Sequence, residues 1–250
     1  MWRSRTILCV SCCLTRVELL YQANSHKAPR VFFYQTDITS QAALKQVAEQ
    51  IRKDHGDPTV LINNAGVASD GTILDKSDVN IRRTMEVNTL SHFWTVREFL
   101  PSMIKRNHGH VVTVASLASF VSFVEGVDYA CSKASALAFH EGLTQEIRHK
   151  YGSKKVRTSA IHPLWVRTPM IEKLAQAGSH WKEPVLEPRD ISSAVIGQIV
   201  SGNGGQVVVP GSYGLAALVR AYPSWIQEWI RNGISEKFVK LRQLQEDMAK

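Results

Sequence analysis

The sequence contains no glycine before Gly56, although the chain has 15 glycines in all. A loop that cradles a phosphate at the start of a helix needs glycines, because they let backbone N–H groups approach the anion closely. No loop of that kind can be placed ahead of Val31. We therefore treat residues 1–30 as an atypical N-terminal segment.

The chain also lacks long apolar runs and has few cysteines. The apolar stretch from Ile7 to Leu14 is too short to cross a bilayer. Because it follows two arginines, it resembles a weak secretory or mitochondrial targeting signal. Three of the four cysteines crowd near the N-terminus, and Cys131 stands apart. This spacing gives neither a disulfide framework nor a zinc site, so we expect no metal.

Positive charge is in excess but is not concentrated. The chain has 30 Lys+Arg against 22 Asp+Glu, a formal net charge of +8. Its basic pairs, such as Arg82-Arg83 and Lys154-Lys155, are isolated and have no aromatic RNA-binding signature beside them. We therefore expect no nucleic-acid partner. The sign of the charge suits an anionic cofactor or an anionic lipid.

From Val31 onward, short apolar runs alternate with amphipathic stretches, a pattern typical of parallel strands joined by crossover helices. A chain of 250 residues can bury one large core. We predict a doubly wound α/β domain over residues 31–212, followed by a helical segment over residues 213–250. The expected strands are Val31–Tyr34, Val60–Ile62, His110–Val114, Val156–Ile161 and Gln206–Val209.

The expected helices lie between these strands. One spans Ser40 to Lys53, and a longer one runs from Asp78, as its N-cap, to about Met103, where Pro101 sharpens its end. A third spans Tyr129 to His149, and a fourth opens with Pro188 in its first turn.

The most informative string is Tyr129-Ala130-Cys131-Ser132-Lys133. Residues four apart on a helix share a face, so the phenol and the ammonium are neighbours. A free tyrosine has a pKa of about 10, and only about one molecule in a thousand is ionised at neutral pH. Lowering that pKa to about 7 takes roughly 4 kcal/mol, which a partly desolvated lysine and a second positive charge nearby could supply together. Tyr129 could then move a proton.

Two further strings follow buried strands directly. Ser116 comes just after His110–Val114, and Asn63-Asn64-Ala65-Gly66 comes just after Val60–Ile62. The carboxyl ends of parallel strands are where α/β sheets bind ligands, and small residues there let backbone approach a cofactor. We expect these strings to converge.

Together, in this order and spacing, these residues resemble the short-chain dehydrogenase/reductase family. The resemblance runs from about Val31 to Pro210. It implies a Rossmann-like fold and a catalytic group of Asn88, Ser116, Tyr129 and Lys133. Tyr129 would exchange the proton, Ser116 would hold the substrate oxygen, Lys133 would also bind the nicotinamide ribose, and Asn88 would steady a water in a proton relay.

The resemblance also implies NADP or NAD as cofactor, with NADP slightly favoured. Asp37 would end a strand and touch the adenine ring, and the segment from His162 to Pro169 would lie beneath the nicotinamide. The implied cofactor-binding residues are Asp37, Ile38, Asn64, Ala65, Gly66, Tyr129, Lys133, Pro163, Val166 and Thr168.

Within the family, the Val-Asn-Thr-Leu string around Asn88 and the aromatic, basic C-terminus look most like fungal relatives of the retinol and 17β-hydroxysteroid dehydrogenases. This implies a hydrophobic alcohol or ketone as substrate, such as a retinoid, a steroid or another lipid. It also implies a homodimer, located in the cytoplasm or on the surface of the endoplasmic reticulum or of lipid droplets.

The C-terminal segment fits two interpretations. Trp225, Ile226 and Trp229 form an aromatic and apolar face beside Arg220 and Arg231. Such a face packs into the core or closes over a substrate, or it contacts a lipid surface. It is not expected to span a membrane.

The sequence departs from the family pattern in two places. Leu164 replaces the usual glycine of the nicotinamide loop, and residues 1–30 give no regular first βαβ unit, although Ile7–Val10 and Val17–Leu20 could fill part of its strand or helix. We expect an N-terminal truncation or a mis-predicted start exon. The alternative to an enzyme is therefore a catalytically inactive relative that serves as an interaction or lipid-surface module.

Overall fold

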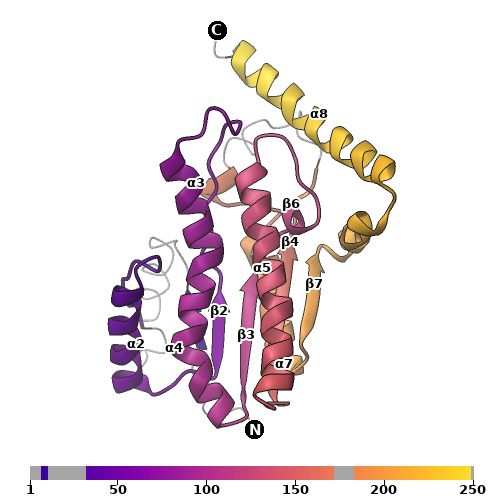
Figure 1. Cartoon of the computed structure of the whole chain (residues 1–250). Coiled ribbons are helices and arrows are strands. Elements are labelled where there is room, and N and C mark those ends of the chain that lie inside the picture. The colour runs from indigo at the N-terminus through magenta and orange to yellow at the C-terminus, as the bar shows by residue number, and fades with distance from the viewer. Residues whose placement is uncertain (1–6, 11–31, 172–182, 249–250) are drawn as a thin grey trace.

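The computed structural model describes residues 7–10, 32–171 and 183–248 (Figure 1). Five parallel strands form one sheet in the order β1-β2-β3-β4-β7. These strands are β1 (Ile7–Val10), β2 (Val60–Asn63), β3 (Gly109–Val114), β4 (Val156–Pro163) and β7 (Gly205–Val209). A second, two-stranded parallel sheet joins β5 (Trp165–Val166) to β6 (Val185–Leu186). The predicted parallel α/β architecture is confirmed.

Strand β1 comes from the atypical N-terminal segment. Ile7 pairs with Val60 and Val10 pairs with Asn63, in parallel register. In the usual doubly wound order 3-2-1-4-5-6, the first strand lies beside the fourth. The placement of β1 next to β2 fits that order, with β2 in the place of the fourth strand. Ile7–Val10 thus fills part of the first strand, whereas Val17–Leu20 lies outside the described residues.

The strand predicted at Val31–Tyr34 is wrong for its described residues 32–34, which form neither strand nor helix. The side chains of Phe32 and Tyr34 contact the end of a helix instead. The Phe32 ring lies 3.9 Å from the His55 ring, centroid to centroid, and the Tyr34 hydroxyl donates to Asp54 at 2.7 Å. A run of β-favouring residues forms a strand only where a neighbouring strand can pair with it.

Helices cover both faces of the sheet. On one face lie α2 (Gln41–His55), α4 (Ser91–Lys105) and α5 (Val127–Gln145), which bury Ala48, Phe99 and Leu143 against Leu61 and Val111. On the other face, α7 (Pro188–Ser201) buries its own apolar residues against β2, β3 and β4. The buried residues there are Val60, Val112, Ile161, Ile191, Val195 and Ile199. Neighbouring residues of one strand, such as Val60 and Leu61, therefore serve opposite cores.

The predicted helix from Asp78 to Met103 is wrong in its details. Ser77, not Asp78, is the N-cap of α3 (Asp78–Met85), and its hydroxyl accepts from the Asn80 N–H at 3.3 Å. A π-helical turn, η1 (Glu86–Leu90), separates α3 from α4. Pro101 lies inside α4 and does not end it. The apolar periodicity reveals a helix here, but it does not show this extra residue in the turn.

The C-terminal helix α8 (Ser224–Met248) lies beyond the carboxyl ends of the strands (Figure 1). The Phe123 ring, which precedes α5, stacks on Phe238 of α8 with centroids 4.9 Å apart. The ring centroids of Trp165 in β5 and Phe238 lie 5.5 Å apart. Among the described residues, no helix combines the length and apolar character that crossing a bilayer requires.

Candidate active site

The predicted polar residues meet at the carboxyl ends of β2, β3 and β4. Asn64–Gly66 follows β2, Ser116 follows β3, and Pro163 ends β4. Ser116 is the N-cap of the short 3-10 helix Leu117–Ser119, and its hydroxyl accepts from the Ala118 N–H at 3.1 Å. This cap fixes the serine where the parallel strands end.

Lys133 is a buried cation on α5, only 3% exposed. Its Nζ donates to the Val114 carbonyl at the end of β3, at 3.0 Å, and lies 5.7 Å from the centroid of the Tyr129 ring. Helical spacing therefore places phenol and ammonium together, as expected from the sequence. The cation is also held at the same sheet edge as Ser116.

The phenol of Tyr129 is neutral in the protein alone. Burial raises the pKa of this phenol, and a hydrogen bond with Ser116 lowers it by a smaller amount. Desolvation disfavours the charged phenolate, whereas the neighbouring hydroxyl favours it. The neutral phenol is the form that can donate a proton.

Asn88 lies in the π-helical turn η1 and is fully buried. Its amide pairs with the backbone of Val67, donating from Nδ2 to the carbonyl at 2.9 Å and accepting from the N–H at 2.8 Å. Nδ2 also donates to the Ser132 hydroxyl at 2.9 Å. The side-chain N–H groups of Asn88 thus bind protein groups, and its predicted part in a water relay stays a prediction.

Gly66 leaves space beside the cation. A Cβ at this position would lie 3.4 Å from Lys133 Nζ and 3.6 Å from Asn88 Oδ1. The backbone after β2 can therefore run close to the buried lysine. A small-residue loop, a buried cation and a phenol at one sheet edge are a donor set that fits a nicotinamide ribose.

The remaining predicted cofactor residues lie elsewhere in the chain. Asp37 is exposed and caps a turn, accepting from the Thr39 N–H at 2.9 Å, and Ile38 follows it. Asp37 does not end a strand, because none forms there. Val166 is in β5, and the Thr168 hydroxyl donates to its carbonyl at 3.2 Å. Any phosphate-binding turn after β1 would fall on residues 11–31, outside the described residues.

Sequence reasoning missed several buried polar residues of this site. Thr89 and Ser132 join η1 to α5, and His162 reaches the Ser116 carbonyl from Nδ1 at 3.1 Å. Ser132 lies inside the string singled out above, and a serine in mid-helix often bonds a carbonyl one turn back. That tendency is the feature of the sequence from which the role of Ser132 could have been predicted.

A family profile described as short chain dehydrogenase matches residues 5–178. The chain belongs to this family. The match begins ahead of the Val31 at which the sequence resemblance was expected to start, and it therefore includes β1.

Similarity to short-chain dehydrogenases extends to individual proteins. The chain is 57% identical over 129 residues to "Dehydrogenase RED3" of Cochliobolus heterostrophus, which covers 52% of this chain and 66% of that protein. It is 35% identical over 203 residues to "Estradiol 17-beta-dehydrogenase 11" of Rattus norvegicus, which covers 81% and 66%. The chain therefore spans somewhat less than two thirds of the length of these relatives.

Solved structures of short-chain dehydrogenases share the fold. A short-chain dehydrogenase from Streptomyces avermitilis superposes with a TM-score of 0.73 at 19% identity, covering 93% of this chain and 98% of that one. A short-chain type dehydrogenase/reductase from Mycobacterium marinum gives 0.71 at 18% identity, covering 83% and 85%. The Rossmann-like fold is thereby confirmed. This family fold implies a nicotinamide cofactor, NAD or NADP.

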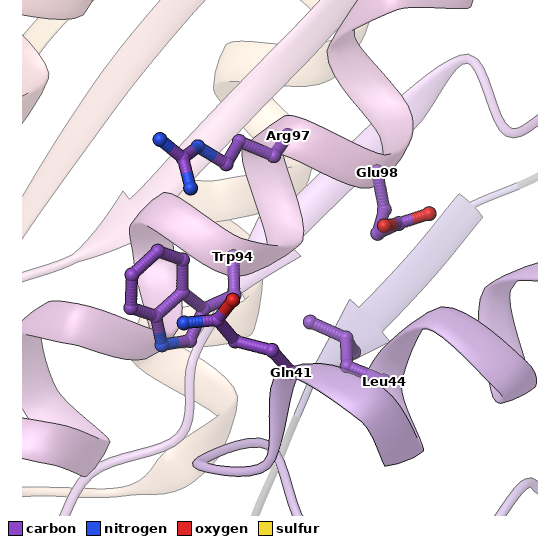
Figure 2. Close-up of a pocket in the computed structure, with 5 residues that line it drawn as sticks. All are labelled: Gln41, Leu44, Trp94, Arg97 and Glu98. Atoms are coloured by element: carbon purple, nitrogen blue, oxygen red, sulfur yellow. The ribbon is translucent and has the colours of Figure 1, made fainter.

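A small cleft between α2 and α4 is separate from these residues (Figure 2). Gln41 and Leu44 of α2 face Trp94, Arg97 and Glu98 of α4. The Arg97 guanidinium lies 5.3 Å from the Trp94 ring centroid, and Glu98 pairs with Arg52 at 3.2 Å. The Arg52–Glu98 pair joins α2 to α4, and none of the predicted site residues lines this cleft.

Proposed function

We propose that this protein is an NAD(P)-dependent oxidoreductase that interconverts a hydrophobic alcohol and its carbonyl compound. The observation that carries the proposal is the buried Lys133 ammonium beside the Tyr129 phenol, with Ser116 bonded to the same phenol. A cation next to a phenol is the arrangement that lets tyrosine act as an acid and a base. Retinoids, steroids and other lipids are the substrate class we favour.

The bound nicotinamide would supply or accept the hydride. In carbonyl reduction the Tyr129 phenol gives its proton to the substrate oxygen, and Lys133 stabilises the phenolate that remains. Ser116, which already bonds the phenol, holds the substrate oxygen in place. In alcohol oxidation the same proton returns to Tyr129. We propose that Asn88 belongs to the catalytic group, and its side chain also ties η1 to the loop after β2.

We propose that the cofactor is held by Lys133 and Tyr129 at the ribose and by the backbone of Asn64–Gly66. Pro163 ends β4, Val166 lies in β5 and Thr168 follows β5, and these residues would face the nicotinamide. Asp37 and Ile38 would meet the adenine. We favour NADP over NAD on the family resemblance.

Cofactor titration followed by nicotinamide fluorescence tests this function. We expect saturable binding of NADPH or NADH, and the absence of binding at millimolar concentration would refute an active enzyme. Tyr129→Phe should lower turnover at least about 100-fold, because the proton donor is removed, while the cofactor still binds through Lys133 and the backbone of Asn64–Gly66. Tyr151→Phe is the matched control, since this tyrosine is 48% exposed. Equal turnover of the two variants would contradict the role of Tyr129.

A lipid-surface role is the second candidate, and one observation favours it. Trp225 and Trp229 at the start of α8 are 71% and 75% exposed, and Leu215 before them is 71% exposed. Exposed tryptophans beside basic residues suit a membrane interface. We propose that α8 brings the protein to the surface of the endoplasmic reticulum or of lipid droplets, and that the protein is otherwise cytoplasmic.

Vesicle flotation tests this role. The wild-type protein should float with vesicles that contain anionic lipid, and the double variant Trp225→Ala/Trp229→Ala should stay in the soluble fraction. Val79→Ala is the control, because this residue is 72% exposed on α3. Equal flotation of all three proteins would exclude the tryptophans as the contact.

We propose further that the protein forms a homodimer through the helices that carry Asn88 and Tyr129, where Leu90 and Phe93 are exposed.

A further inference from the structure

The turn of α5 that carries Tyr129 and Lys133 is held from three sides by buried hydroxyl groups. The Ser132 hydroxyl donates to the Tyr129 carbonyl at 2.7 Å. Thr89 of η1 donates to the Ser132 carbonyl at 3.1 Å, and Ser119 donates to the Lys133 carbonyl at 2.8 Å. These three hydroxyl residues are 6% exposed or less. Two of the three bonds come from outside the helix, so they fix the turn relative to other segments.

Ser132 differs from the other two because it also reaches Asn88. Its Oγ accepts from Asn88 Nδ2 at 2.9 Å while its O–H donates to the Tyr129 carbonyl. Asn88 is in turn paired with both backbone groups of Val67. A hydroxyl has one donor and can accept as well, so Ser132 can join both groups at once. The bonds run without a break from the loop after β2, through Asn88 and Ser132, to the backbone of Tyr129.

This path bears on the geometry of proton transfer. The Tyr129 phenol must keep its place against Ser116 and Lys133, which are fixed to the end of β3. The bonds through Ser132 set the position of the helical turn from the side of β2. A displacement of about 1 Å can cost roughly 100-fold in rate. Ser132 makes its bonds to Asn88 and to the Tyr129 carbonyl, so any effect it has on the reaction must act through position.

We propose that Ser132 is a positioning residue, whose hydroxyl transmits the placement of Asn88 and the β2 loop to the turn that carries Tyr129. Its kinetic consequence rests on the proposed function, whereas its effect on the Tyr129 phenol does not. The competing explanation is that Ser132 only provides a small side chain where α5 packs on η1. In that case alanine would serve equally well.

Titration of the Tyr129 phenol in the cofactor-free protein separates the two explanations. The phenol can be followed by NMR with tyrosine labelled at the ring carbon that bears the hydroxyl, and Tyr129→Phe identifies its signal. In Ser132→Ala we expect the pKa of this phenol to rise, because displacement weakens the hydrogen bond with Ser116. Ser135→Ala is the matched control, a serine on the same helix, and should titrate like the wild type. Identical curves for both variants would overturn the proposal.

Kinetics supplies the second measurement. We expect Ser132→Ala to lower kcat at least about tenfold, with the cofactor KM nearly unchanged and the pH profile shifted in the same direction as the phenol. If Ser132→Ala does not fold, Thr89→Val tests the same turn and should shift the phenol in the same direction by less. An unchanged phenol in the folded variant contradicts the proposal. A wild-type protein without turnover would refute the proposed function, while the phenol titration would still decide on Ser132.

Discussion

Three histidines lie in the interior around the candidate active site. His92, His140 and His162 are at most 5% exposed. Burial lowers the pKa of His92 to about 3 and that of His140 to about 4, and it also lowers the pKa of His162. The cation of Lys133 adds to this effect at His92 and His162. These imidazoles are therefore neutral near pH 7 and become a source of instability in acid.

The sign of this pH dependence follows from the direction of the shifts. Each of these histidines has a lower pKa when folded, so the unfolded chain takes up protons first as the pH falls. Their contribution to stability is complete above the ordinary histidine pKa of 6.5 and is lost between about 6.5 and 3 for His92. In that window, each such histidine lowers the free energy of unfolding by up to about 1.4 kcal/mol for every unit by which the pH falls.

We predict that His92→Leu makes the protein less sensitive to acid. Urea unfolding at about pH 7 and about pH 5 should show a smaller loss of unfolding free energy in this variant than in the wild type. His149→Gln, at an exposed position, should lose as much unfolding free energy between these two pH values as the wild type does. If His92→Leu loses as much unfolding free energy in acid as the wild type, then His92 protonates freely in the folded protein.

Residues at strand ends and on helix faces were the predictable part of the site. The sequence places Ser116 and Asn64–Gly66 after buried strands and sets Tyr129 one turn from Lys133, and the structure brings these residues together. The contact between Asn88 and Ser132 was not predictable, because it joins residues far apart in the sequence. Local periodicity carries no information about such a pairing.

At the scale of elements, a buried ion pair ties the segment before α3 to the start of α5. Lys76 and Asp128 form this pair, with side chains 3% and 6% exposed. Lys76 Nζ also donates at 3.1 Å to the carbonyl of Glu125, which has a positive φ of 62°. A non-glycine residue in that conformation needs support from its surroundings. Lys76 therefore holds the turn that leads into the helix of Tyr129.

We predict that Lys76→Met lowers the free energy of unfolding by about 3–5 kcal/mol, because Asp128 stays buried without its partner. The double variant Lys76→Met/Asp128→Leu should recover much of this loss, since it leaves no unpaired charge. Lys45→Met, on the exposed face of α2, is the control and should change little. Denaturant unfolding measures all three. A double variant less stable than Lys76→Met would contradict this account.

The elements were predictable where apolar periodicity and tertiary packing agree. Four of the five predicted strands and the predicted helices are present, with ends shifted by a few residues. Phe32–Tyr34 failed because strand propensity cannot show whether a neighbouring strand is available. The π-helical turn escaped prediction because one extra residue hardly changes the pattern of a long helix.

At the scale of the whole molecule, α8 is docked across the carboxyl ends of the strands (Figure 1). Phe238 packs between Phe123 and Trp165, and Arg242 Nε donates to Glu125 at 3.1 Å. These contacts join the last helix to the turn before α5 and to β5. The contacts of α8 thus reach the turn that leads into the helix of Tyr129.

We predict that Phe238→Ala loosens this docking. Native-state hydrogen exchange of the α8 amides should be about tenfold faster, which corresponds to about 1.4 kcal/mol of local opening. Val239→Ala, at a residue that is 44% exposed beside it, should leave the rates unchanged. Equal rates in the two variants would mean that the aromatic contacts do not hold α8.

The π-helical turn between α3 and α4 also limits how the chain can change in length. A π-helical turn holds one residue more than an α-helical turn. Removing one residue between Glu86 and Leu90 would therefore leave a regular α-helix, with α3 and α4 on nearly the same faces and with Phe99 and Met103 still in the core. Asn88 would lose its bonds to Val67, because they depend on the shape of this turn. A one-residue deletion here should therefore harm the candidate active site more than it destabilises the fold.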